Sequence, residues 1–282
     1  MQFKTALAQI NPVLGEVKKN REIHLKFIED AIKEKAELIV FPELSITGYY
    51  LRDLAMEVAL PSFSNFFEPI FRKSKEIDIV LGFVEKGRDS NIYNSAMYIS
   101  DGSPKMVYRK IYLPTHGMFE EQRFMARGDR VEAFDTKFGK VALLICRDLF
   151  HPSLVLLTFA AGADIVIVPS NMPIRGLDGE KSAIERTVEN AVAIYTNFFG
   201  NFVIYVNRVG FDDGLGFFGG SFIGTPTGNK LGYAGTFEEC LTSSIIDTEE
   251  IFKKRQLFPL AREEDLNIVA NNFKRIMEEK NG

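Results

Sequence analysis

The chain has 282 residues, 46% of them hydrophobic, and a formal net charge of -4 that comes from acids and bases interspersed along its whole length. Such a chain can bury a large core, and without a basic stripe to neutralise phosphates we expect no nucleic-acid partner. The first residues, MQFKTALAQINP, lack a charged leader before a long apolar segment. No later run approaches the roughly 20 apolar residues of a membrane span. We therefore expect a globular cytoplasmic protein with no membrane partner.

The metal-binding residue types are sparse. The sequence holds two cysteines, Cys146 and Cys240, and three histidines, all of them scattered. These residues predict neither a disulfide framework nor a structural zinc site. We expect no metal and no cofactor.

Short apolar runs rich in Val, Ile and Phe predict strands along the whole chain. In chain order these runs are FKTALAQI at 3–10, ELIVFPE at 37–43, IDIVLGFVE at 77–85, NSAMYIS at 94–100, MVYRKIYL at 106–113, KVALLIC at 140–146, DIVIVPS at 164–170, FVIYVNRV at 202–209, GSFIGTP at 220–226 and LTSSIID at 241–247. Amphipathic patterns predict helices over 18–35, 63–76, 153–162, 180–199 and 264–279.

The alternation of strands and helices predicts a layered α/β protein with mixed sheets. No low-complexity linker interrupts the pattern, so we expect one domain over residues 1–282. The Gly-rich stretch 210–228 is predicted to be a loop that feeds a site.

Glu43 directly follows the apolar run LIVFP. Ligands of open α/β sheets gather outside the carboxyl ends of strands, so an acid at this position can reach a site. Partial desolvation beside Phe41 and Leu44 would raise its proton affinity and suit it to general-base work. Taken alone, the motif is more typical of an acid at a turn or a helix start. Tyr49 and Tyr50 are compatible with a pocket or with a loop.

Arg109 and Lys110 are adjacent in the run MVYRKIYL. Successive side chains of a strand point to opposite faces, so one of these two cations must turn inward, where it needs an anionic partner. Glu43, Glu120 or Glu121 can supply that partner.

Cys146 ends the run KVALLIC and is followed by Arg147, Asp148 and a helix expected from Pro152. A cysteine in an apolar run is more often a buried core residue. Its position at the end of the run favours a second interpretation, in which the sulfur is exposed and the next backbone N–H groups face an oxyanion. Because a free thiol has a pKa of about 8.5, a nearby lysine and carboxylate would have to activate it.

Taken together and in this order, FPELSITGY, RKIYLP with FEEQRF, and LLICRD resemble the Glu-Lys-Cys motifs of the nitrilase superfamily of carbon–nitrogen hydrolases. The resemblance covers almost the entire chain, from ALAQINPVLGEVKKN to YVNRVG and GGSFIGTPTGNKL. It implies an αββα sandwich of two mixed sheets flanked by helices, and subunits that pair, so that we expect a homodimer or higher homo-oligomer. It assigns the base to Glu43, the lysine to Lys110, the nucleophile to Cys146 and the second glutamate to Glu121, with Glu120 as its easily mistaken neighbour.

The resemblance also implies a reaction, the hydrolysis of a small linear amide or N-carbamoyl compound through a thioester on Cys146. In it Glu43 takes the thiol proton, Lys110 and the backbone N–H of Arg147 stabilise the oxyanion, and Glu121 helps Glu43 to activate water. Candidate substrate-binding residues are Tyr49, Arg147, Asn171 and Arg175, of which Arg175 would meet a substrate carboxylate.

Two branches of the superfamily are represented in the motifs. QINPVLGEVKKN and ITGYYLRDL look most like the glutamine-hydrolysing domain of glutamine-dependent NAD synthetases, whereas NRVG and FFGGSFIGTPTG look closer to N-carbamoyl amine and amino acid amidohydrolases. Arg147 differs from the aromatic or acidic residue common after the nucleophile in both branches. Nitrile hydrolysis is less favoured, because the Trp-Glu pair usual in nitrilases is missing after Cys146.

Several alternatives stay open at this point. The first is a free-standing glutaminase subunit that passes ammonia to a separate synthetase, and the second is a catalytically silent scaffold of the same fold. A papain-like pair of Cys146 with His116 or His151 is a third. His24 is interpreted as a helix-face residue and Cys240 as a packing residue.

Overall fold

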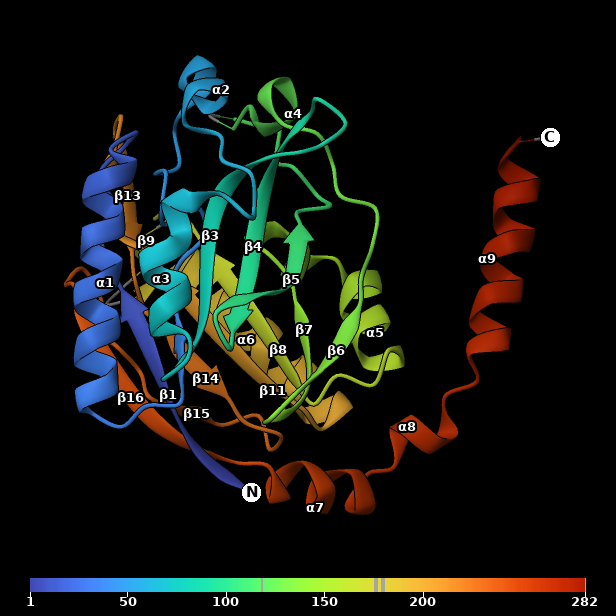
Figure 1. The fold of residues 1–282 in the computed structure, drawn as a ribbon. Helices are drawn as coiled ribbons and strands as arrows, with labels where there is room; N and C mark the ends of the chain where they lie inside the picture. The colour runs from blue at the N-terminus through green and yellow to red at the C-terminus, as the bar shows by residue number, and fades with distance from the viewer. Residues whose placement is uncertain (118, 175–176, 179–180, 282) are drawn as a thin grey trace.

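The structure, a computed structural model, describes residues 1–117, 119–174, 177–178 and 181–281 (Figure 1). Its strands are β1 (Gln2–Gln9), β2 (Leu38–Val40), β3 (Asp78–Lys86), β4 (Ile92–Ser100), β5 (Ser103–Arg109), β6 (Ala133–Thr136), β7 (Gly139–Leu143), β8 (Ile165–Ser170), β9 (Leu177–Asp178), β10 (Lys181–Ser182), β11 (Phe202–Asn207), β12 (Val209–Asp212), β13 (Leu215–Phe218), β14 (Phe222–Gly224), β15 (Lys230–Leu231) and β16 (Cys240–Asp247). Its helices are α1 (Val17–Lys33), α2 (Ala55–Val58), α3 (Glu68–Lys73), α4 (Glu121–Phe124), α5 (Pro152–Ala160), α6 (Ala183–Phe199), α7 (Glu249–Leu257), α8 (Leu260–Glu263) and α9 (Leu266–Asn281), with 3-10 turns η1 (Arg52–Leu54), η2 (Asn65–Phe67) and η3 (Cys146–Phe150).

Two 6-stranded sheets form the centre of the fold, with strand orders β16-β1-β2-β3-β4-β5 and β15-β14-β11-β8-β7-β6. Both sheets are mixed. In the first, β1, β2 and β3 are parallel to one another while β16, β4 and β5 pair antiparallel. In the second, β7, β8 and β11 are parallel while β6, β14 and β15 pair antiparallel.

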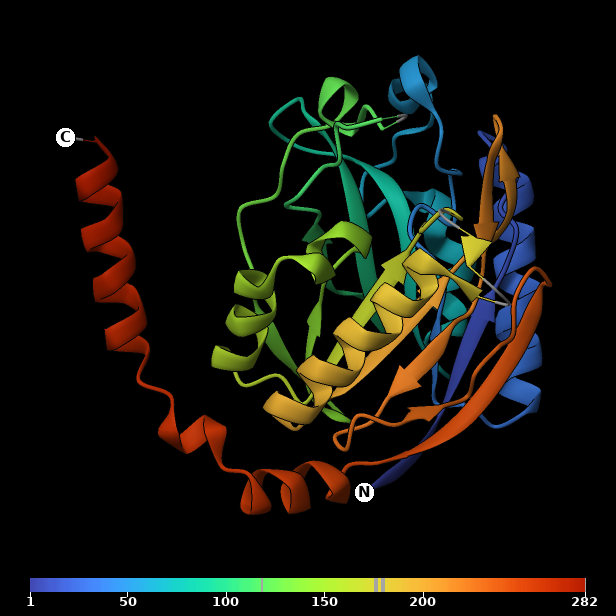
Figure 2. The ribbon, with the colours of Figure 1, turned by 180° about the vertical axis from the view of Figure 1, so that it is seen from behind.

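Helices cover the outer faces of both sheets. α1 and α3 lie on the first sheet, and α5 and α6 lie on the second (Figures 1 and 2). Strand β2 shows how the sequence builds these layers, because its side chains alternate between the two faces. Leu38 and Val40 join the core between the sheets, whereas Ile39 packs with Ile28 of α1 and Ile70 of α3. This arrangement confirms the predicted fold of two mixed sheets flanked by helices.

Four of the five predicted helices form nearly as expected, as α1, α5, α6 and α9. The helix expected over 63–76 is divided into η2 and the shorter α3. Pro69 explains the division, because it stands in the first turn of α3 and cannot lie in the interior of a longer helix that starts before it.

The prediction of a loop over 210–228 is wrong, because most of that stretch pairs as the hairpin β12–β13 and the strand β14. Buried Phe217 and Phe218 anchor the hairpin, while Gly214 and Gly219 adopt positive φ angles of 82° and 76° at its turns. The short edge strand β6 was not predicted, since its residues AFDT carry little apolar signal.

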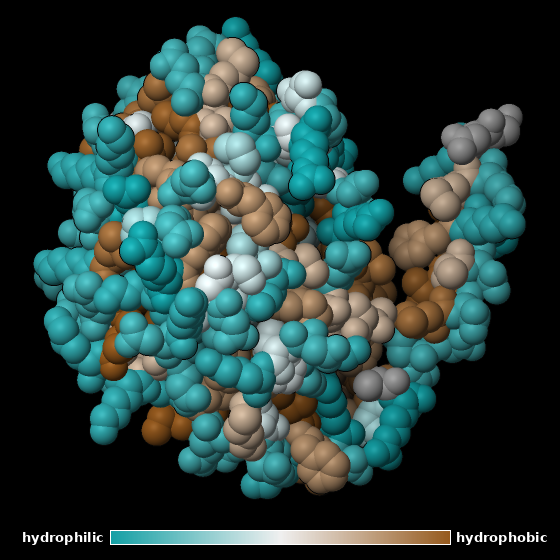
Figure 3. Space-filling model, in the orientation of Figure 1, coloured by the Kyte–Doolittle hydropathy of each residue, from teal (hydrophilic) through white to brown (hydrophobic). Residues whose placement is uncertain are grey.

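The last three helices form an arm. α7 runs past the end of the sheets, and α9 projects away from them (Figures 1 and 2). Ile268, Phe273 and Met277 of α9 are 61%, 55% and 57% exposed. Figure 3 shows apolar side chains on the side of this helix that faces the sheets. Among the described residues, none of the helices combines the length and hydropathy needed to cross a bilayer.

His24 ties helix α1 to the chain after β2. Its imidazole is fully buried and hydrogen bonds to the Asn20 carbonyl at 2.7 Å and to the Ser45 hydroxyl at 2.9 Å. The ring also stacks on Phe41, with 4.1 Å between the centroids. Burial lowers the pKa of His24 from 6.5 to about 4. The sequence interpretation of His24 as a helix-face residue thus misses a structural contact two residues from Glu43.

This buried histidine predicts a loss of stability in mild acid. Between pH 6.5 and about 4 the unfolded chain protonates His24 while the folded chain does not, so the free energy of unfolding falls as the pH falls. From pH 7 to pH 5 we expect the wild type to lose about 2 kcal/mol more than His24→Gln does, measured by urea unfolding. His116→Gln, at an exposed histidine, is the control that should follow the wild type. Identical pH dependence in wild type and His24→Gln would contradict the assignment.

Candidate active site

Glu43 lies in a turn that follows β2, and its side chain is 1% exposed. The turn is held from two sides. The Asn171 side-chain amide donates to the Glu43 carbonyl oxygen at 2.8 Å. On the other side the turn packs directly on the backbone of β3, where a Cβ atom at Gly82 would lie 2.3 Å from the Leu44 nitrogen. The next residue, Leu44, has a positive φ of 47°.

Lys110 comes directly after β5 and is 0% exposed. Its Nζ donates to Glu43 Oε1 at 2.7 Å and to Glu121 Oε1 at 2.8 Å. Burial opposes the charged ammonium, but the carboxylates of Glu121 and Glu43 outweigh it and hold the pKa of Lys110 above its ordinary value. The lysine is therefore a permanent cation between two carboxylates.

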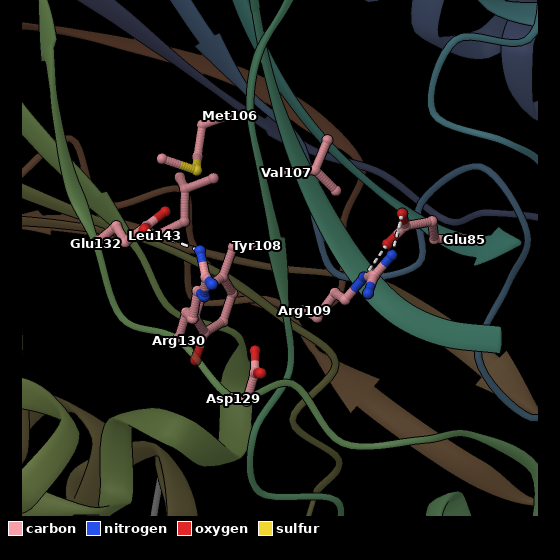
Figure 4. A pocket seen from close by; sticks show the side chains of 9 residues that line it. All are labelled: Glu85, Met106, Val107, Tyr108, Arg109, Asp129, Arg130, Glu132 and Leu143. Atoms are coloured by element: carbon pink, nitrogen blue, oxygen red, sulfur yellow. Dashed lines mark hydrogen bonds and ion pairs between the residues drawn. The ribbon is translucent and has the colours of Figure 1, made fainter. Parts of the chain in front are cut away.

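Arg109 points to the opposite side, as the alternation of a strand requires. Its guanidinium makes two bonds to Glu85, at 2.8 and 2.9 Å. The sequence predicted that one of these two cations turns inward, and in the structure that residue is Lys110. The Arg109 pair borders an open pocket of about 410 Å³ beside β5, where Arg130 and Glu132 also pair with each other at 3.8 Å (Figure 4). None of the residues that line this pocket is a cysteine or a histidine, so we place the candidate site elsewhere.

Glu121 begins α4 and is 8% exposed. Besides Lys110 it accepts a hydrogen bond from the Tyr49 hydroxyl at 2.7 Å. Burial and the nearby charge of Glu43 raise its pKa, against the opposing effect of Lys110. Glu120 lies on the surface and pairs with Arg123 at 3.7 Å. Of the two adjacent glutamates, the structure therefore brings only Glu121 to Lys110.

Asn94 of β4 joins the two carboxylates and was missed in the sequence. Its amide nitrogen donates to Glu43 Oε1 at 2.7 Å and lies 3.5 Å from Glu121 Oε2. With Lys110 and Asn94 both on Oε1, Glu43 Oε2 remains buried without a hydrogen-bond partner among the described residues. That oxygen is a free acceptor in the cluster, as is Asn94 Oδ1.

Cys146 starts the turn η3, three residues beyond the end of β7. Its φ of 46° is unusual for a residue with a side chain and marks a sharp turn. Burial and the charge of Glu43 raise the pKa of the thiol, while Lys110 lowers it. The hydroxyl of Ser170 and the backbone N–H of Asn171 also lower it. The sulfur is thus protonated at rest, and the charges of Glu43 and Lys110 both act on it.

Asp148 fixes this turn and was also not anticipated. Its buried carboxylate accepts bonds from the Tyr112 N–H at 2.8 Å, the Tyr108 hydroxyl at 2.8 Å and the Ile145 N–H at 3.2 Å. Burial raises its pKa to about 6. Asp148 therefore connects the cysteine turn to the segment that carries Lys110.

A small cavity of about 70 Å³ opens on the sulfur. Its lining residues are Tyr49, Pro114, His116, Phe119, Cys146, Arg147, Asn171, Met172, Pro173 and Ile184. The volume admits a small group of a few non-hydrogen atoms. The predicted pocket residues Tyr49, Arg147 and Asn171 therefore reach the same space as Cys146, whereas Arg175 lies outside the described residues.

The histidines do not form the alternative pair with Cys146. His151 stacks on Tyr112 with a centroid distance of 3.4 Å, and burial lowers its pKa. His116 lines the cavity but is exposed and packs edge-on against Phe119. Across the described ranges, no hydrogen bond joins either ring to the sulfur. No group of three or more His, Cys, Asp or Glu residues in the same ranges is placed to hold a metal ion.

Comparisons with known proteins identify the family to which the chain belongs. The family model described as carbon-nitrogen hydrolase matches residues 4–256. The chain is 31% identical over 251 residues to the glutamine-dependent NAD(+) synthetase of Acinetobacter baylyi, covering 88% of this chain and 45% of that protein. It thus spans less than half the length of that relative. It is also 31% identical over 268 residues to the nitrilase of Pyrococcus abyssi, covering 89% and 92% of the two chains.

A solved structure shows the same fold over nearly the full length. The carbon-nitrogen hydrolase from Helicobacter pylori G27 superimposes with a TM-score of 0.83 at 24% sequence identity, covering 98% of this chain and 99% of that one.

The buried cluster predicts that Lys110 supports stability. In Lys110→Met, Glu43 and Glu121 would remain buried without a counter-ion, so we expect a loss of about 3 to 5 kcal/mol in the free energy of unfolding at pH 7. Urea unfolding measures it. The control is Lys105→Met on β5, whose side chain is 41% exposed and 4.0 Å from Asp101. It should lose less than about 1 kcal/mol. Equal losses in the two variants would refute the assignment.

Proposed function

This chain belongs to the carbon–nitrogen hydrolase family, and we propose that it hydrolyses a small linear amide or N-carbamoyl compound through a thioester on Cys146. The observation that carries the proposal is the buried cluster beside the sulfur. Lys110 occupies one oxygen of Glu43 and leaves Oε2 free to accept a proton. A thiol that is protonated at rest needs such a base.

In the first half of the proposed reaction, Glu43 takes the thiol proton as the sulfur attacks the carbonyl carbon. A C–S bond forms, and the carbonyl oxygen becomes an oxyanion that Lys110 Nζ and the backbone N–H of Arg147 stabilise. The C–N bond then breaks. Ammonia or an amine leaves with the proton that Glu43 held, so Glu43 is again a carboxylate.

In the second half, water attacks the thioester and gives its proton to Glu43. The C–S bond breaks, the acid is released, and Cys146 recovers its proton from Glu43. Glu121 and Asn94 contribute by position, because they hold Lys110 and the carboxylate of Glu43 in place through both steps.

Removal of the nucleophile tests this proposal. We expect Cys146→Ala to lose roughly 10³-fold or more of the rate of ammonia release, assayed over a panel of amides, carbamoyl compounds and glutamine. The matched control is Cys240→Ala, whose half-buried thiol bonds to the Ala234 carbonyl, and it should keep wild-type activity. Mass spectrometry should detect an acyl adduct on Cys146 and none on Cys240. A wild-type rate in Cys146→Ala disproves the mechanism.

A stand-alone glutaminase subunit is the second candidate, favoured by the similarity to glutamine-dependent NAD(+) synthetase over 45% of that protein's length. In that case glutamine is the best substrate of the panel, and adding a separate synthetase raises the rate. Hydrolysis of simple amides with no action on glutamine excludes it. The same panel addresses a silent scaffold, which would release no ammonia from any compound.

We also propose that the chain forms a homodimer or a higher homo-oligomer. Exposed apolar side chains support this, both on α9 and on the outer helices, where Leu157, Ile194 and Phe198 are 50%, 51% and 51% exposed. Faces of this kind on one chain are suited to contact with a second copy.

The oligomer proposal predicts a measurable mass. Light scattering on a sizing column should give at least twice the chain mass of 31.9 kDa. Phe273→Glu combined with Met277→Glu should shift the mass toward the monomer, because charges replace apolar contacts. Lys274→Glu combined with Lys280→Glu, which changes charge on the same helix without removing apolar side chains, is the control. A wild-type monomer at micromolar concentration contradicts the proposal.

A further inference from the structure

Arg147 is a half-buried cation at the cavity beside Cys146, and the described residues give it no anionic partner. It directly follows Cys146 and lines the same small cavity. Within the described residues its guanidinium makes no ion pair and no side-chain hydrogen bond. The buried carboxylates of Glu43 and Glu121 are already engaged by Lys110.

Other arginines with similar burial are satisfied. Arg109 binds Glu85, Arg255 binds Asp164 at 2.8 Å, and Arg21 reaches Glu22 at 3.2 Å. A partly desolvated guanidinium is stabilised by a planar anion that can accept two parallel bonds. Arg147 therefore differs from these arginines, because the described residues leave its guanidinium donors unused and it lines the same cavity as Cys146.

A second arginine without a carboxylate partner in the described residues lies on the surface near His151. Arg127 donates to the Ile111 carbonyl at 2.8 Å and lies over the Tyr112 ring, 5.3 Å from its centroid, but the described residues offer it no carboxylate. The charges of Arg147 and Arg127 both act on His151, which stacks on Tyr112. At the cavity itself, the positive charge of Arg147 favours an anion.

The other residues that line the cavity limit which chain of atoms can connect an amide at Cys146 to an anionic group at Arg147. Beside the polar Tyr49, His116 and Asn171, the lining includes apolar residues, and the whole cavity has about 70 Å³; the aliphatic ones are Pro114, Met172, Pro173 and Ile184. A short hydrocarbon spacer suits such walls, since it needs no hydrogen-bond partner there.

We propose that the substrate is a linear amide with a carboxylate a few carbons from the amide carbon, and that the Arg147 side chain binds this carboxylate. The inference rests on the proposed function for the chemistry at Cys146 and adds the class of substrate. Arg147 then acts twice, with its backbone N–H toward the oxyanion and its guanidinium toward the far end of the substrate.

The test compares two linear amides, succinamic acid and butanamide. Succinamic acid ends in a carboxylate, and butanamide ends in a methyl group. We expect wild-type kcat/KM to be higher for succinamic acid. In Arg147→Met the ratio of kcat/KM for the two amides should fall by about 10- to 100-fold, mainly through KM for succinamic acid. Arg147→Lys should retain part of the preference. Arg72→Met, on the exposed face of α3, is the control for net charge.

Binding is measured separately, so that failure of the proposed chemistry does not hide the result. In Cys146→Ala, calorimetry should detect succinamic acid, and adding Arg147→Met should weaken binding by the same factor. The inference is overturned if butanamide is the better wild-type substrate, or if Arg147→Met lowers kcat/KM for both amides by the same factor. It is also overturned if adding Arg147→Met to Cys146→Ala leaves the affinity for succinamic acid unchanged. Binding that depends on Arg147 in a protein without turnover would refute the proposed reaction alone.

Discussion

The site depends on one buried ammonium shared by two carboxylates. Lys110 Nζ lies 2.7 Å from Glu43 and 2.8 Å from Glu121, with no exposure to water at the lysine. Two buried carboxylates without this cation would repel each other and lose hydration, and one of them would have to take up a proton. The lysine thus holds together a turn after β2, the end of β5 and the start of α4, which are distant in the sequence. Asn94 adds a neutral link between the same two acids.

In the proposed reaction, the same cluster keeps the sulfur protonated until a substrate is present. Burial and Glu43 raise the pKa of Cys146, so the thiolate forms only when its proton can move to the carboxylate and an electrophile accepts the sulfur. A protonated, buried thiol also reacts slowly with oxidants and stray electrophiles. The proposed reaction is in this way coupled to occupancy of a small cavity.

The sequence predicted the fold well because strand and helix periodicities are local. Adjacent cations in a strand also predicted that one must be buried, and the structure identifies Lys110. Asn94 and Asp148 were missed because a polar residue inside an apolar run has no local feature that tells an inward-facing bond from a solvent-facing one. Their hydrogen-bond partners are far away in the sequence. Tyr108, for example, donates to Asp148 across 40 positions. The sequence alone likewise could not predict that Arg147 has no carboxylate partner among the described residues.

The close packing of the Glu43 turn on β3 restricts which residue can stand at position 82 of this chain. At Gly82 the missing side chain is itself a structural component, since even one methyl group would collide with the backbone of Leu44. The position of the Glu43 carboxylate is therefore encoded partly by a residue that has no functional group and does not line the cavity. An alanine at that strand position would displace the carboxylate while every chemically reactive residue remained in the sequence.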